Sequence, residues 1–318
     1  MNKFALRLLL FIAIPLPILY TASFIIDTGL RKSHHFYYSE WNDLMKGKIN
    51  ADLLIMGSSR AWVHVSPKIL DTTLHINSYN LGMDGTQFNM QYDRFKLYRL
   101  HNKQPKYIIQ TLDFTILTPS NLLHAYQQFL PYLYDTSVRS LTSHYIGKFG
   151  VGDYYFPLYK YNNELPVAKE GLMSFFNKGV PALKYKGYQG QNKLWDSTFE
   201  KFVNSAPEGT KIKVDPKSVL LMEEFLTYCQ QNGIKVILVF PPVYSEFLKY
   251  CLNKDEIIGL YEGLHTKYDV PFLNYLDDDL SAHKENFYNS QHMNKHAAEE
   301  FSMKLAADIT PIIKGRSL

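Results

Sequence analysis

A short apolar strand that runs directly into a serine-containing turn is the feature that most constrains this chain. Residues 53–56 read Leu-Leu-Ile-Met, Gly57, Ser58 and Ser59 follow, and a helix is predicted from Ala61. A strand that turns sharply into a helix lifts one side chain above the edge of a sheet and points the free N–H groups of the helix start at the same place. Serine in that position is exposed enough to act as a nucleophile, although serine is also a common helix cap.

Apolar strands and amphipathic helices alternate along both ends of the chain. We predict strands at 53–56, 76–81, 107–112, 234–240 and 270–274, and helices at 86–101, 217–232, 245–268 and 294–313. This alternation is typical of an α/β three-layer sandwich, in which helices cover both faces of a central parallel sheet.

The middle of the chain interrupts that alternation. Residues 119–215 are rich in Tyr, Phe, Gly, Pro and Asn and are expected to hold short helices at best. A stretch of this length within a compact domain is usually a functional insertion or a lid. We therefore predict one α/β domain over 49–318 that carries this aromatic-rich insertion.

The amino-terminal segment is predicted to anchor the chain in a membrane. Residues 8–26 are almost wholly apolar and close to the roughly 20 residues that a spanning helix requires. The alternative is a cleaved secretory signal, but the apolar run is long for one and no clear cleavage site follows. We assign 1–30 to a single-pass anchor and 31–48 to a linker, and we expect the main domain to be extracytoplasmic. Arg31 and Lys32 nearly balance Lys3 and Arg7, so the charge bias for this orientation is small.

Composition excludes some classes of function. The net charge is only +4 and the basic residues are scattered, which argues against a nucleic-acid partner. No cofactor motif is present, and no Cys/His cluster has metal-ligand spacing, so neither a cofactor nor a metal is expected. Cys229 and Cys251 are either a disulfide pair or free core thiols.

A histidine near the carboxyl end of the chain is placed to meet the serine turn. His292 lies between the last predicted strand and the last predicted helix, and hence at the carboxyl edge of the sheet. Ser59 lies at that edge too, where open parallel sheets bind their ligands. We expect the two side chains to converge.

In these segments the chain resembles the SGNH (GDSL-type) hydrolase superfamily. Gly57-Ser58-Ser59 is similar to its Gly-x-Ser block, and Asn80-Leu81-Gly82 to the block that carries a glycine after the second strand. The segment 289–294, Asn-Ser-Gln-His-Met-Asn, is similar to the Asp-x-x-His block apart from its first residue. The resemblance covers about 50–115 and 216–312 and implies an SGNH/flavodoxin-like fold. The anchor and the insertion resemble the membrane-tethered branch that acylates or deacylates cell-surface polymers.

The resemblance implies a role for each matched residue. Ser59 would be the nucleophile and His292 the general base, and the backbone N–H groups of Ser59 and Gly82 would form the oxyanion hole. Asn289 takes the usual position of the aspartate that orients the histidine; an amide oxygen still accepts a hydrogen bond there but carries no charge.

Two further positions bear on the predicted site. Asp113 stands where the family usually has an oxyanion asparagine, and as a carboxylate it cannot donate. We take Asp113 and Arg60 as candidate substrate contacts. The run Asp277-Asp278-Asp279 is either a solvated turn, which we favour, or the source of a substitute carboxylate.

The sequence therefore predicts a serine esterase or O-acyltransferase that acts on a cell-surface polysaccharide or a related glycan ester. The alternative is an inactive SGNH-like module that binds glycan or a membrane-bound acyltransferase partner, and a scaffold without a small-molecule site is a third hypothesis. Asn289 and Asp113 favour the inactive module somewhat.

Overall fold

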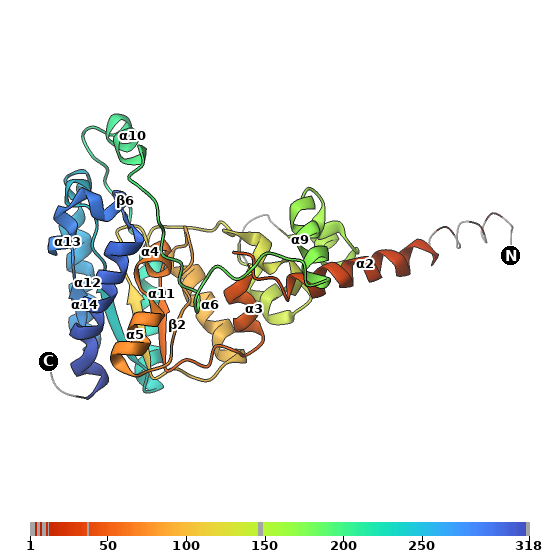
Figure 1. Cartoon of the computed structure of the whole chain (residues 1–318), viewed down its shortest axis with the longest axis horizontal. Coiled ribbons are helices and arrows are strands. Elements are labelled where there is room, and N and C mark those ends of the chain that lie inside the picture. The colour runs from red at the N-terminus through yellow and green to blue at the C-terminus, as the bar shows by residue number, and fades with distance from the viewer. Residues whose placement is uncertain are drawn as a thin grey trace. The chain divides into compact units, whose positions relative to one another are not determined.

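The computed structural model describes residues 4, 7, 11, 13–36, 38–145 and 149–315. The chain divides into two compact units. The larger unit comprises 47–120 and 184–318, and the smaller comprises 1–46 and 121–183. Figure 1 labels several elements of each unit.

A five-stranded parallel sheet forms the centre of the larger unit, as the sequence predicts. The strands are β1 (Leu53–Met56), β2 (Ser78–Asn80), β3 (Tyr107–Thr111), β4 (Lys235–Phe240) and β5 (Phe272–Asn274). Their order is β2-β1-β3-β4-β5, and every neighbouring pair is parallel. This is the flavodoxin-like order, in which the chain direction across the sheet reverses between β1 and β3. The carboxyl ends of these two strands therefore border the crevice where such sheets bind ligands.

Helices follow the strands closely in the larger unit. They are α4 (Ser59–His64), α5 (Pro67–Leu74), α6 (Phe88–His101), α10 (Thr198–Ser205), α11 (Pro216–Gln231), α12 (Lys254–Tyr268), α13 (Asp279–Ala282) and α14 (Lys295–Ile313). Pro at the first position and the Asp215 side chain, which accepts from the N–H groups of Lys217 and Ser218, start α11. A two-stranded antiparallel hairpin, β6 (Phe287–Asn289) and β7 (His292–Met293), precedes α14.

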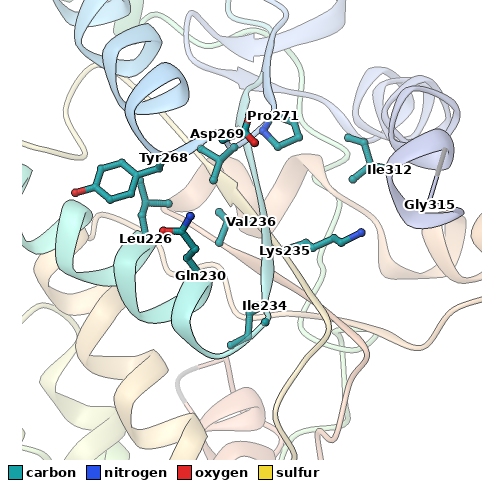
Figure 2. A pocket seen from close by; sticks show the side chains of 12 residues that line it. Leu226, Gln230, Ile234, Lys235, Val236, Tyr268, Asp269, Pro271, Ile312 and Gly315 are labelled. Carbon is teal, nitrogen blue, oxygen red and sulfur yellow. The ribbon is translucent and has the colours of Figure 1, made fainter. Parts of the chain in front are cut away.

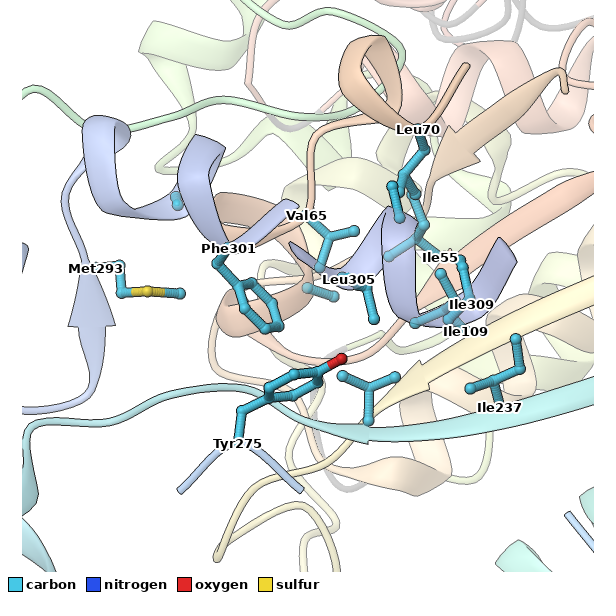
Figure 3. Close-up of a cluster of buried hydrophobic side chains, with 14 of the residues drawn as sticks. Ile55, Val65, Leu70, Ile109, Ile237, Tyr275, Met293, Phe301, Leu305 and Ile309 are labelled. Carbon is cyan, nitrogen blue, oxygen red and sulfur yellow. The ribbon is translucent and has the colours of Figure 1, made fainter. Parts of the chain in front are cut away.

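Alternate residues of the strands supply the core on one face of the sheet. Ile55, Ile109 and Ile237 point into a cluster with Phe301 and Leu305 of α14 (Figure 3). The neighbouring strand residues point to the other face, where α6 and α11 pack on each other through the rings of Phe88, Phe95 and Phe225. Both faces of the sheet are thus covered, which explains why β1 and β4 are almost wholly apolar.

One predicted helix is two elements. The segment predicted as a helix over 245–268 forms the 3₁₀ helix η3 (Ser245–Tyr250) and then α12. Between them Cys251 forms a bridge with Thr210, and the Asn253 side chain pairs with the backbone of Ile212 through both its oxygen and its nitrogen. These backbone partners lie on the preceding segment and replace the helical hydrogen bonds, so the prediction of one continuous helix was wrong.

The smaller unit joins the amino-terminal segment to part of the predicted insertion. It contains α2 (Pro15–Leu30), α3 (Ser39–Met45), η1 (Tyr126–Tyr132), α7 (Thr136–Thr142), α8 (Val151–Tyr155), η2 (Tyr159–Tyr161) and α9 (Leu165–Phe175). Residues 31–46 of the predicted linker are part of this unit, whereas 184–215 of the predicted insertion belong to the larger unit.

The predicted membrane segment is only partly covered by the structure. Residues 8–10 and 12 of the span 8–26 lie outside the described residues. Within the part of the chain that the structure describes, no helix has the length and apolar character needed to cross a bilayer. Elsewhere in the fold, Cys229 and Cys251 are buried free thiols and not a disulfide pair.

Candidate active site

The turn after β1 is shaped by Gly57. Its φ of 147° favours glycine, and a Cβ there would lie 1.9 Å from Thr111 Oγ1 on the neighbouring strand β3. Only a glycine lets the chain leave β1 this close to β3 and enter α4 directly. Ser59 is the first residue of α4 and lies at the carboxyl edge of the sheet. The local sequence therefore fixes where the Ser59 hydroxyl stands.

The structure brings Ser59 and His292 together, although 233 positions separate them. Ser59 Oγ lies 2.6 Å from His292 Nε2, and His292 Nδ1 lies 2.9 Å from Asn289 Oδ1. The Asn289 amide oxygen can only accept a hydrogen bond, so His292 Nδ1 is protonated and donates to it. The unprotonated Nε2 is then free to accept from the Ser59 hydroxyl. The three side chains form a Ser-His-Asn relay with the geometry of a nucleophile, a base and the group that orients the base.

The hairpin β6–β7 carries both His292 and Asn289, the residue that orients its ring. Asn289 ends β6, His292 begins β7, and the two residues are paired in the hairpin. Asn289 Oδ1 also accepts from the N–H of Gln291 at 3.1 Å, which fixes the amide. The ring of Tyr288 stacks on the His292 ring with centroids 5.4 Å apart. The imidazole therefore has little freedom to turn away from Ser59.

A second histidine, His64, holds this hairpin by a hydrogen bond to β7. His64 ends α4, is fully buried, and its Nε2 accepts from the N–H of Met293 at 2.9 Å. Its ring lies 6.0 Å from that of His292. Burial, first of all, and then the neighbouring His292 and Arg60 hold the pKa of His64 well below its usual value, so it is neutral and accepts. Sequence reasoning missed His64, because nothing in a helix-end histidine marks it as a partner of a strand 229 positions away.

Behind the serine, Ser58 and Arg60 face in different directions from Ser59. Ser58 donates to Asp113 Oδ2 at 2.6 Å, and Arg60 Nη2 donates to Gln291 Oε1 at 2.8 Å. Arg60 and Asp113 are 2% and 3% exposed, so neither side chain reaches the surface where a substrate would bind. Both candidate substrate contacts are thus placed as supports: Asp113 holds the serine turn, and Arg60 holds the loop of the hairpin.

Asp113 remains ionised in this buried position. Burial alone would raise its pKa, but the Arg60 charge and the hydrogen bonds from Ser58 and Thr115 outweigh burial, and its pKa lies below the usual value. Asp113 is therefore no donor to an oxyanion. The charge of Asp113 in turn stabilises the buried, positively charged Arg60 guanidinium.

The N–H of Gly82 has an acceptor within the protein. It donates to Asn80 Oδ1 at 2.8 Å, and the Asn80 amide nitrogen donates to the carbonyls of Ala61 and Val65 near the end of α4. A Cβ on Gly82 would lie 2.3 Å from the nitrogen of Trp62, so this glycine permits close packing of its loop on α4. Of the two N–H groups assigned to the oxyanion hole, that of Ser59 at the start of α4 is the better placed.

Burial dominates the electrostatics of His292. Burial first of all, and then the positive charge of Arg60, lower the pKa of the imidazole to about 3, while Asp113 acts in the opposite direction. The ring is consequently neutral across the acid and neutral range and able to accept a proton. Asn289 brings no negative charge, so an imidazolium at His292 would be poorly stabilised.

The acidic run 277–279 plays no part in this arrangement. Asp278 caps α13 by accepting from the N–H of Leu280 at 3.0 Å and pairs with Lys304. The oxygen that His292 Nδ1 contacts is that of Asn289. The interpretation of this run as a solvated turn fits Asp277 and Asp279, which are exposed, but not Asp278, whose side chain is 5% exposed.

A cavity of about 610 Å³ lies at the other edge of the sheet. It is lined by residues at the amino ends of β4 and β5, among them Ile234, Lys235 and Pro271, and by Ile312 near the end of α14 (Figure 2). Among the described residues that line it there is no histidine or serine, and Ser59 lies at the carboxyl edge. No group of three or more His, Cys, Asp or Glu side chains that could hold a metal ion is found over the described ranges.

Several solved structures resemble this chain at low sequence identity. No protein-family model matches the chain, and no curated protein is significantly similar to it. A structure from Desulfitobacterium hafniense described as a lipolytic protein of the G-D-S-L family is 12% identical, with 80% of this chain and 97% of that chain covered and a TM-score of 0.39. A Bacteroides fragilis protein described as an acylhydrolase is 11% identical, with 86% and 95% covered and a TM-score of 0.40. A GDSL-like lipase from Bacteroides thetaiotaomicron is 12% identical, with 83% and 87% covered and a TM-score of 0.37. At these TM-scores the similarities do not decide a function for this chain. The function proposed below rests on the geometry of the site.

Proposed function

We propose that this protein is a serine ester hydrolase or O-acyltransferase of the SGNH type. The observation that carries the proposal is the 2.6 Å contact between Ser59 Oγ and His292 Nε2, with Asn289 orienting the imidazole. A hydroxyl that is hydrogen-bonded to a neutral base, which is in turn held by an orienting group, is an activated nucleophile. The start of α4 supplies backbone N–H groups beside the same hydroxyl, which suits the negative charge that develops on an ester carbonyl.

The reaction follows from these positions. Ser59 Oγ attacks the ester carbonyl as its proton passes to His292 Nε2, and a tetrahedral oxyanion forms. The intermediate collapses, the alcohol leaves with the proton from Nε2, and the acyl group remains on Ser59. Water or a second hydroxyl then attacks the acyl-enzyme by the same steps in reverse, which gives hydrolysis or acyl transfer. Asn289 holds the ring in place but adds no charge.

The substrate and the location are proposed from the sequence. The resemblance to the membrane-tethered branch supports a cell-surface glycan ester as substrate, and the apolar run 8–26 supports a membrane anchor with the main domain extracytoplasmic. A membrane-bound acyltransferase partner would fit the same setting. A reporter fused to the carboxyl terminus tests the orientation: an export-dependent phosphatase should be active there, and an inactive phosphatase beside an active cytoplasmic reporter would reverse the assignment.

One observation favours an inactive, binding-only relative. A His292 pKa of about 3 beside a neutral Asn289 makes the base weak. The purified full chain in detergent should nevertheless react with a fluorophosphonate and cleave p-nitrophenyl acetate, and Ser59→Ala should lose both. Ser205→Ala is the matched control, because Ser205 is exposed at the end of α10 and its hydroxyl bonds the carbonyl of Phe202 and not His292. A wild type that shows neither labelling nor turnover but binds polysaccharide would establish the binding module instead.

A further inference from the structure

The smaller unit exposes an unusual amount of apolar side chain. Among the residues that the structure describes, the exposed large apolar side chains of the larger unit are isolated ones, namely Leu100, Tyr185, Leu194, Leu220, Leu252 and Met303. In the smaller unit Phe36, Leu122, Tyr134, Val180 and Leu183 are exposed on other segments, and a larger set lies on three neighbouring segments: Ile18, Tyr20 and Phe24 on α2; Tyr155, Phe156 and Tyr159 on and after α8; Leu165, Leu172, Met173 and Phe176 on and after α9. We call this set the apolar face.

The three segments belong to one packed assembly. Helices α2 and α9 cross so closely that a Cβ on Gly29 would lie 1.7 Å from the carbonyl oxygen of Gly171. The Tyr20 hydroxyl donates to the carbonyl of Tyr155 at 3.2 Å, which ties α2 to α8. Inside the unit, a buried ion pair between Lys160 and Asp27 at 2.9 Å joins α2 to η2. The apolar face is therefore built on a fixed framework.

The chemistry of the apolar face matches the boundary between lipid tails and headgroups. Phe24, Phe156 and Phe176 are 65%, 59% and 61% exposed, which is costly in water. Cations lie beside aromatic rings of this region: Arg139 is 5.1 Å from the ring centre of Tyr155, and Lys32 is 5.2 Å from that of Phe175, the neighbour of Phe176. Aromatic rings with Lys and Arg next to them are enriched at membrane interfaces, where the cations reach the phosphates.

The position of the face in the chain points to the same occupant. From Pro15 onward the apolar run 8–26 forms part of α2, which contributes Ile18 and Phe24 to the face. A bilayer that received residues 8–26 would meet the side chains of α8 and α9 where they pack beside that helix. A lipid surface thus accounts for both the anchor and the exposed side chains around it.

We propose that the smaller unit lies in the interfacial layer of a membrane, with the exposed side chains of α2, α8 and α9 in contact with lipid. This rests on the anchor proposed above and extends it: the chain has a lipid-facing surface beyond the spanning segment. Interfacial burial of such a surface would hold the unit against the bilayer instead of leaving it on a free tether.

Spin labels on the full chain test the proposal. Phe156→Cys and Phe176→Cys place labels on the apolar face, and Leu194→Cys and Leu220→Cys are matched exposed apolar positions in the larger unit. Burial raises the pKa of the Cys229 and Cys251 thiols to about 12 and about 11, so the native cysteines stay unlabelled. The protein is reconstituted in nanodiscs of phosphatidylcholine with some phosphatidylglycerol, and label accessibility to oxygen and to a water-soluble nickel chelate is measured.

Labels at 156 and 176 should be several-fold more accessible to oxygen than to nickel, while labels at 194 and 220 should show the reverse. Nickel-accessible labels at 156 and 176 in an inserted protein would overturn the lipid-facing surface and leave the anchor intact. Low accessibility to both reagents with spin–spin broadening would assign the apolar face to a second copy, which also overturns the proposal. A chain that does not enter nanodiscs would defeat anchor and surface together, whereas the ester hydrolase stands or falls on its own assay.

Discussion

Placing a carboxylate at position 289 should make His292 a stronger base. In Asn289→Asp the new carboxylate takes the place of an amide oxygen 2.9 Å from His292 Nδ1. The two charge centres would be ~4 Å apart, and at an effective dielectric constant of ~20 the attraction is ~4 kcal/mol. This corresponds to a rise of ~3 units in the pKa of His292. The pKa of about 3 in the wild type should thus move to near 6.

The pH dependence of kcat/KM reads this shift directly. A protonated His292 cannot accept the Ser59 proton, so activity falls as the pH drops through the pKa of the imidazole. Wild-type kcat/KM for p-nitrophenyl acetate should be flat from about pH 5 to 8, whereas Asn289→Asp should lose activity below pH ~6. Because the carboxylate also stabilises the imidazolium in the transition state, its plateau should be ~10- to 10³-fold higher.

The matched control is Asn232→Asp, which adds the same charge at an exposed position at the end of α11, near the amino end of β4. It should leave the pH profile unchanged. Identical profiles and plateaus for Asn289→Asp and the wild type would refute the reasoning, because they would mean that His292 is not the base or that Asn289 does not orient it.

Three further predictions concern the supports of the site. His64→Phe should lower kcat with little change in KM, because the Met293 N–H loses its acceptor at a cost of ~1–3 kcal/mol. His64→Gln keeps an acceptor and should restore most of kcat. Equal kcat in both variants would show that His64 has no role in positioning the hairpin. Gly57→Ala should destabilise the protein by more than ~2 kcal/mol in urea unfolding, whereas Gly233→Ala, at a φ of 68° with open space around it, should cost only ~1 kcal/mol; similar costs would show that the turn after β1 is not constrained as described. His292 binds no proton in the folded state until the pH nears 3, while the unfolded chain binds one below pH ~6.5, so this residue removes stability as the pH falls through that window. The wild type should therefore lose ~2–3 kcal/mol relative to His292→Gln between pH 7 and 4.5, and a constant difference between the two proteins would contradict the lowered pKa.

Much of the fold was predictable because the strands are short apolar runs closed by strong signals. Residues 234–240 end at Pro241, and 53–56 end at Gly57; both strands form as predicted. The convergence of Ser59 with His292 was predictable as well, since parallel strands end at one edge. The break at Cys251 was not, because it depends on pairing with Thr210 from a distant segment.

The supports of the site were not predictable in the same way. His64 and Arg60 each depend on a partner that only the tertiary fold supplies: His64 on a strand N–H, and Arg60 on the Gln291 amide. Short-range patterns carry no trace of such pairs. The hairpin 287–293 was also missed, because Asn289-Ser290-Gln291 has the composition of an open loop.

The placement of Asn289 and His292 on one hairpin has a mechanical consequence. The two residues are cross-strand partners, so the spacing within that pair is set by the hairpin itself, whereas the spacing to Ser59 is set by how the hairpin sits on the end of α4. A small tilt of β6–β7 would lengthen the serine–imidazole gap and leave the tautomer untouched. Rigid-body motion of one short ribbon would thus switch nucleophilicity on and off without rearranging the base.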